Sequence, residues 1–206
     1  MNNIETTQNI SQRTAQVQRE TGETRVSVRL NIDGKGNYDI HTGVGFLDHM
    51  LTQVAVHGLF DITIQAEGDL IVDCHHTVED VALVLGEAFN KALGNRKGIT
   101  RMASLFIPMD DSLAFVAVDL SGRPYTVFRA NWLGTSIGTI PVSLIGHFFE
   151  SFAIQAKCNL HARILYGQDD HHKAEALFKG LGRALDAATQ IEIRRAEVVP
   201  SSKGIV

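Results

Sequence analysis

The stretch CHHTVEDVALVLGEA, residues 74–88, places two adjacent histidines ahead of a Glu-Asp pair and a run of apolar residues. The apolar run has the length and spacing of a buried helix. Polar residues at the head of such a helix are ordinarily capping or solvated groups, because acidic side chains near a helix start are favourable. A second stretch, DHHKAEALFKGLGRA at residues 170–184, argues against that interpretation because it repeats the pattern.

The repeat extends beyond the histidine pairs. Both stretches share H-H-x-x-E and then a glycine at the same position, Gly86 or Gly182. Upstream, FLDHML matches LIGHFF, which places His49 opposite His147. Internal similarity at a fixed offset indicates a duplicated unit, here of roughly 90 residues.

The elements predicted for each half are a hairpin, a helix, two strands and a second helix. In the first half, alternating residues around Asp33-Gly34 predict the hairpin, and DITIQAEGDLIVD predicts two strands joined by a turn at residues 67–69. In the second half, a strand pair is predicted around residues 121–124. The expected fold class is α+β, a tandem duplication of a hairpin-helix-strand-strand-helix half with the helices sandwiched between two mixed β-sheets.

The length of 206 residues suits one large domain. We expect a flexible N-terminal leader at 1–13 and a single catalytic domain at 14–198. Its two repeats are predicted at about 14–102 and 103–198. The remaining residues, 199–206, form a C-terminal tail.

Composition excludes several classes of protein. A net charge of −4 gives no basic face for nucleic acid. The chain has no run of eighteen apolar residues that could span a membrane, and its first residues resemble neither a signal nor a transit peptide. The two cysteines, Cys74 and Cys158, cannot form a disulfide framework and suit a reducing compartment. We therefore predict a cytoplasmic protein that binds neither nucleic acid nor membrane.

Histidine is the anomaly, with nine residues of which four form two adjacent pairs. Successive helical residues project about 100° apart, so adjacent histidines point toward different ions and the glutamate projects between them. Two such helices could build two mixed sites of three histidines and one carboxylate, which suit Mn, Fe, Co, Ni or Zn. Which ion each glutamate joins stays open at this stage. The candidate ligands are His49, His75, His76, Glu79, His147, His171, His172 and Glu175.

Three alternatives accompany this hypothesis. Cys74 adjoins the first pair and could be a ligand, but the second copy has Asp170 there, so we expect an ordinary buried thiol. A dinuclear metallohydrolase could use the same ligands to cleave a phosphate ester. A metal-storage or redox carboxylate protein would be a four-helix bundle, which the predicted strands VSVRLNI and LAFVAVDL argue against.

Six motifs together resemble the imidazoleglycerol-phosphate dehydratase family: HTGVGFLDHML, DCHHTVEDVALVLGEA, DLSGRPY, GHFFESFA, DDHHKAEALFKGLGRAL and PSSKG. The similarity runs from about residue 19 to residue 204. It implies a lyase that dehydrates D-erythro-imidazole glycerol phosphate to imidazole acetol phosphate in L-histidine biosynthesis. It also implies two Mn²⁺ ions per active site. From the metals follows the hypothesis that each ion binds one ring nitrogen of the substrate, which favours the imidazolate form. The family forms a homo-oligomer, a 24-mer built from trimers, with sites at subunit contacts.

The resemblance also implies residue roles. The family's metal ligands fall on the eight residues that the repeat selected. Glu23 is the expected catalytic base, which takes the C2 proton of the substrate. The tail becomes a phosphate clamp, and Asp110 and Asp111 could line the pocket. The expected substrate contacts are Glu23, Gln53, His57, Arg101, Arg123, Lys179, Ser201, Ser202 and Lys203.

Overall fold

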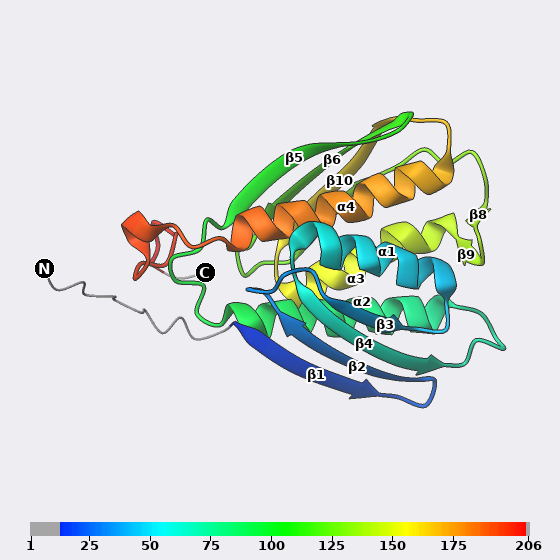
Figure 1. Cartoon of the computed structure of the whole chain (residues 1–206), viewed down its shortest axis with the longest axis horizontal. Coiled ribbons are helices and arrows are strands. Elements are labelled where there is room, and N and C mark those ends of the chain that lie inside the picture. The colour runs from blue at the N-terminus through cyan, green and yellow to red at the C-terminus, as the bar shows by residue number, and fades with distance from the viewer. Residues whose placement is uncertain (1–12, 205–206) are drawn as a thin grey trace, which may run out of the picture.

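Two four-stranded mixed sheets enclose a layer of four helices (Figure 1). The computed structural model describes residues 13–204. The leader predicted at 1–13 therefore lies outside the described residues except for Arg13, as do the last two residues of the predicted tail. The expected α+β class, with helices between two mixed sheets, is confirmed. None of the helices within the described part of the chain is long and apolar enough to cross a membrane.

The first half forms the lower sheet in Figure 1 and two of the helices. Its sheet has the strand order β1-β2-β4-β3, in which β3 runs parallel to β4 and the other pairs are antiparallel. Its elements are β1 (Thr14–Glu20), β2 (Thr24–Asn31), β3 (Tyr38–His41), α1 (Gly45–Gly58), β4 (Asp61–Gly68) and α2 (His75–Leu93).

The second half repeats this topology. Its sheet has the order β5-β6-β10-β7, with β7 parallel to β10, so strands equivalent in sequence occupy equivalent places. A short ribbon and a 3₁₀ turn are additions without a counterpart in the described first half. The elements are β5 (Met102–Met109), β6 (Ser112–Asp119), β7 (Tyr125–Arg129), β8 (Ser136–Ile137), β9 (Ile140–Pro141), α3 (Val142–Ala156), β10 (Asn159–Tyr166), α4 (Asp170–Thr189) and η1 (Ile193–Arg195).

The two predicted strand pairs, around Asp33-Gly34 and around residues 121–124, are wrong because the flanking strands do not pair with each other. The strands flanking Asp33-Gly34, β2 and β3, do not pair, because β4 lies between them. The strands flanking residues 121–124, β6 and β7, are separated by β10 in the same way. The hairpins are instead β1–β2 and β5–β6. Alternation of apolar and polar residues predicts a strand and its buried face, but it carries no information about the neighbouring strand.

The second strand predicted after β4 is also wrong. Residues 70–72 form a turn, and the side chain of Ile71 is 98% exposed. Both edges of β4 are already occupied by β2 and β3, so a returning strand has no free edge to pair with. Each half therefore has one strand, not two, between its helices.

The four predicted helices are confirmed, and they pair across the duplication. Helix α1 packs on α4, and α2 packs on α3. The glycines shared by the two copies lie at these crossings. Gly86 of α2 meets the carbonyl oxygen of Phe152, and Gly182 of α4 meets that of Val54. A side chain at either position would collide with backbone, so the shared glycines permit the close approach of each helix pair.

Candidate metal centre

An aspartate fixes the start of each histidine-bearing helix. The side chain of Asp169 caps α4 and accepts the backbone N–H of His171 at 2.7 Å. Asp73 accepts the N–H of His75 at 2.7 Å at the start of α2. These contacts satisfy backbone donors that a helix start leaves unpaired, so each histidine pair lies at a capped helix start.

One candidate group joins α1 and α4 and consists of His49, His171 and Glu175, the α1–α4 group. Oε2 of Glu175 lies 3.3 Å from Nε2 of His49 and 3.2 Å from Nε2 of His171. The two imidazole rings lie 5.3 Å apart between centroids. Two ring nitrogens and one carboxylate oxygen therefore converge on one point from facing helices.

The second group joins α2 and α3 and consists of His75, Glu79 and His147, the α2–α3 group. Oε2 of Glu79 lies 3.8 Å from Nε2 of His75 and 3.6 Å from Nε2 of His147. The two rings are 5.0 Å apart. Nε2 of His147 is buried and has no hydrogen-bond partner within residues 13–204. A buried acceptor nitrogen without a partner, facing a carboxylate and a second imidazole, fits a site for a divalent cation.

The other two predicted ligands, His76 and His172, join neither group. Nδ1 of His76 lies 3.0 Å from Asp69, and Nδ1 of His172 lies 2.6 Å from Asp111. These hydrogen bonds raise the pKa of both histidines. The prediction that adjacent histidines point apart is thus reflected in the geometry. Within the described chain, however, each group has two histidines and one carboxylate instead of the expected three and one.

An acid from a hairpin turn lies near the free nitrogen of each of these outlying histidines. Oε2 of Glu23, in the β1–β2 turn, is 3.7 Å from Nε2 of His76. Oδ2 of Asp110, in the β5–β6 turn, is 3.5 Å from Nε2 of His172. The duplication therefore places an equivalent carboxylate beside an equivalent imidazole in each half.

Comparison with known proteins now decides the family. The family model described as imidazoleglycerol-phosphate dehydratase matches residues 42–185, which hold both groups. The chain belongs to this family. Its members are metal-dependent lyases of histidine biosynthesis that act on a small phosphorylated substrate.

Individual relatives agree with this assignment. The chain is 57% identical over 196 residues to an imidazoleglycerol-phosphate dehydratase of Roseiflexus sp. (strain RS-1), covering 95% of this chain and 98% of that protein. It is 54% identical over 195 residues to the dehydratase of Methanothermobacter thermautotrophicus, with coverage of 95% and 98%. The Pyrococcus furiosus enzyme, solved in complex with (S)-C348, superposes with a TM-score of 0.80 at 35% identity, covering 92% of this chain and 100% of that one.

Three residues expected to contact substrate gather at the α1–α4 group of the dehydratase. The Lys179 ammonium lies 2.7 Å from Oε1 of Glu175, and the Gln53 amide nitrogen lies 3.5 Å from Nδ1 of His49. Burial by itself would raise the pKa of Glu175, but Lys179 and His49 hold it below the usual range. Burial and the nearby Lys179 lower the pKa of His57. A fixed positive charge thus adjoins this group.

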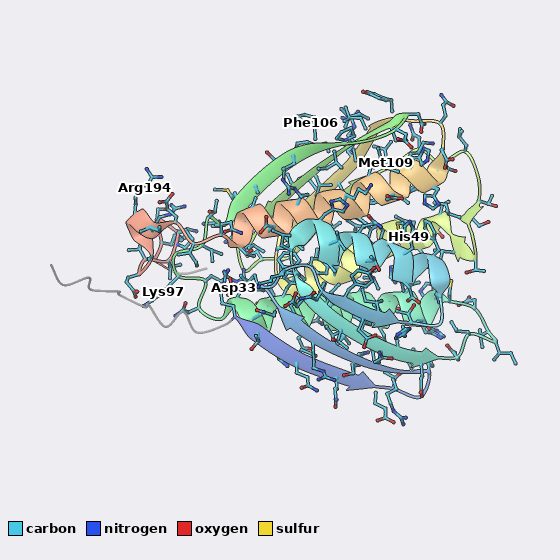
Figure 2. The ribbon with its side chains drawn as sticks, in the orientation of Figure 1. Asp33, His49, Lys97, Phe106, Met109 and Arg194 are labelled. Carbon is cyan, nitrogen blue, oxygen red and sulfur yellow. The ribbon has the colours of Figure 1, made fainter. Side chains whose placement is uncertain are left out.

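Except for Glu23, which lies beside His76, the remaining expected substrate contacts lie at the other end of the molecule. Arg101 forms an ion pair with Asp119 at 2.7 Å and donates to the carbonyl of Pro200 at 2.7 Å, which joins it to the tail. Figure 2 shows His49 at the end of the molecule opposite Lys97 and Arg194, beside which the tail folds. Arg123 follows β6, whose last residue pairs with Met102 next to Arg101. The tail residues at this end are Ser201, Ser202 and Lys203.

Cys74 and Asp80 flank the histidine and glutamate positions of α2 but have structural contacts instead of a place in either group. Cys74 is buried and free, and it belongs to neither group. The buried carboxylate of Asp80 binds Arg19 at 2.8 Å and the hydroxyl of Thr24, so it ties α2 to the first sheet. No motif or repeat in the sequence marks Asp69, which lies in a loop that the second half does not repeat. The position of Asp73 was detectable, because Asp169 stands at the same place before the second histidine pair.

Proposed function

We propose that this chain dehydrates imidazole glycerol phosphate to imidazole acetol phosphate with two Mn²⁺ ions per active site. The observation that carries the proposal is the pair of equivalent groups, each with two imidazoles and one carboxylate, that the duplication builds on facing helices. Three protein donors leave coordination positions open for substrate. Two such groups suit the two ring nitrogens of a substrate imidazole.

The metals would act as Lewis acids that favour the imidazolate form of the substrate. The chain's own residues supply proton transfer and orientation. The Glu23 carboxylate is exposed and lies beside His76, a proposed ligand, which supports the proposal that it takes the C2 proton of a substrate held there. Gln53 and His57 lie on the α1 face that carries His49, where they line the same space.

We infer that complete sites form between copies of this chain. Helix α4 has 20 residues and is therefore roughly 30 Å long, which separates His171 at its start from the tail beyond its end. A small phosphorylated substrate cannot reach both ends within one chain. A neighbouring copy would supply His76 or His172 as the missing imidazole, and the assembly we propose is the 24-mer built from trimers.

The phosphate group would be held by positive charges and hydroxyls. Lysine offers a point charge, arginine a planar fork of donors, and serine a further donor. The proposed set is Arg101, Arg123, Lys179, Ser201, Ser202 and Lys203. Because Arg101 already binds the tail through Pro200, the tail and this guanidinium would act as one unit. The buried, free Cys74 and Cys158 support a reducing cytoplasm as the compartment.

The decisive experiment incubates the Mn²⁺-loaded protein with imidazole glycerol phosphate. We expect the ketone product with its phosphate retained. Release of inorganic phosphate would instead support the dinuclear metallohydrolase. The His171→Ala variant is the matched control, because it removes one ligand of the α1–α4 group and should abolish product formation.

A further inference from the structure

The second histidine of each pair is held by a carboxylate from a different place in each half. Asp69, directly after β4, lies 3.0 Å from Nδ1 of His76. Asp111, in the β5–β6 turn, lies 2.6 Å from Nδ1 of His172. These two loops are not equivalent in the duplication, because the residue after β10 is Gly167 and carries no acid. The same contact thus reaches equivalent histidines from unrelated loops.

Because the two loops are unrelated, this contact is not simply a feature that both halves retained from the duplicated unit. The surrounding loops differ in length and sequence, yet both deliver a carboxylate to Nδ1 and leave Nε2 facing a hairpin acid, Glu23 for His76 and Asp110 for His172. His75 and His171, by contrast, direct Nε2 toward the glutamate of their own helix. The two histidines of each pair therefore have different carboxylate contacts: the first through Nε2 to a glutamate of its own helix, the second through Nδ1 to an aspartate of a loop.

A carboxylate at Nδ1 has a known effect on an imidazole. It holds the proton on Nδ1, leaves the lone pair on Nε2 and fixes the orientation of the ring. We propose that Asp69 and Asp111 are positioning residues, which hold His76 and His172 as Nε2 donors for a divalent cation. This inference rests on the proposed function, in which both histidines are metal ligands.

Asp69 is the cleaner of the two to test. Its carboxylate hydrogen-bonds only His76 among residues 13–204. The carboxylate of Asp111 also accepts the backbone N–H groups of Gln168 and Asp169, so its removal would loosen the β10–α4 loop as well. A change at Asp69 thus reports on the histidine alone.

The experiment measures Mn²⁺ affinity by counting free Mn²⁺ with electron paramagnetic resonance during titration of the full-length protein. Asp69→Asn should weaken binding about 10- to 100-fold. Asp69→Glu should recover most of that loss, because it restores a carboxylate. Glu67→Gln is the matched control: it removes a nearby charge that contacts Arg25 and not His76, and its affinity should match the wild type.

Two further variants separate this inference from the proposed function. His76→Ala should weaken Mn²⁺ binding, and Asp69→Asn added to it should weaken binding no further, because the two act as one unit. If His76→Ala binds Mn²⁺ normally, the ligand role of His76 is wrong. If His76→Ala weakens binding and Asp69→Asn does not, the positioning role alone is wrong. Thermal unfolding of the metal-free variants tests folding, and Asp69→Ser replaces Asp69→Asn if the latter does not fold.

Discussion

The α1–α4 and α2–α3 groups contain the same residue types but differ in their electrostatic surroundings. The side chain of Glu175 is 10% exposed and forms an ion pair with Lys179, whereas that of Glu79 is 37% exposed. At the position of Lys179 the first copy has Leu83. The duplication therefore preserved the candidate ligands, but within residues 13–204 a lysine forms an ion pair with the glutamate of only one group. A duplicated pair of sites need not bind cations equally.

The largest expected effect comes from removing one ligand from each group in turn. Because each group converges on its own point, His49→Ala should lose the ion of the α1–α4 group and His147→Ala that of the α2–α3 group. Elemental analysis after dialysis should find Mn²⁺ per chain reduced by half in each variant. Full retention of both ions in either variant would contradict two separate groups.

Glu23→Gln tests whether the hairpin acids are equivalent. Loss of a general base typically costs 10²- to 10⁴-fold in rate, so we expect kcat to fall at least about 100-fold with Mn²⁺ content unchanged. Asp110→Asn is the matched variant, since Asp110 lies near His172 as Glu23 lies near His76. An unchanged kcat in Glu23→Gln would exclude its role as the base.

Lys179→Met tests the electrostatic difference directly. Removing a positive charge that lies 2.7 Å from Glu175 should tighten Mn²⁺ binding at the α1–α4 group roughly tenfold. KM should rise as well, because Lys179 is a proposed phosphate contact. Leu83→Lys is the converse variant and should weaken binding at the α2–α3 group. If titration of the wild type finds equal Mn²⁺ affinities at the two groups, the expected effect of Lys179 on the α1–α4 group is wrong.

The smallest expected effect concerns the helix crossings. Alanine favours a helix over glycine by about 1 kcal/mol, but a methyl group at Gly86 or Gly182 meets the backbone of the facing helix, and overpacking costs about 1–3 kcal/mol. The net expectation is that Gly86→Ala and Gly182→Ala lower the free energy of unfolding in urea by up to about 2 kcal/mol. Gly45→Ala is the control, because its new side chain would meet nothing within 4 Å. Stabilisation in either crossing variant would contradict close packing there.

Much of the candidate site could be predicted from the chain itself. A histidine pair with a following glutamate, found twice on equivalent helices, together with the matching upstream histidines His49 and His147, predicted every member of the two candidate groups. Asp69 and Asp111 could not be found this way, because they reach their histidines from unrelated loops. The exposed turn at Ile71 and the strand partners of β2 and β6 could not be predicted either, because local alternation of apolar and polar residues does not specify which strands pair.

The sequence by itself determined the duplication, the four helices and their faces, and which side chains could ligate a metal. These follow from local spacing, since a helix repeats its faces every 3.6 residues and a strand every two. Only the tertiary structure decided that α1 faces α4 and α2 faces α3. That pairing depends on contacts between residues far apart in the chain, and it is the reason that each candidate group takes its members from both halves.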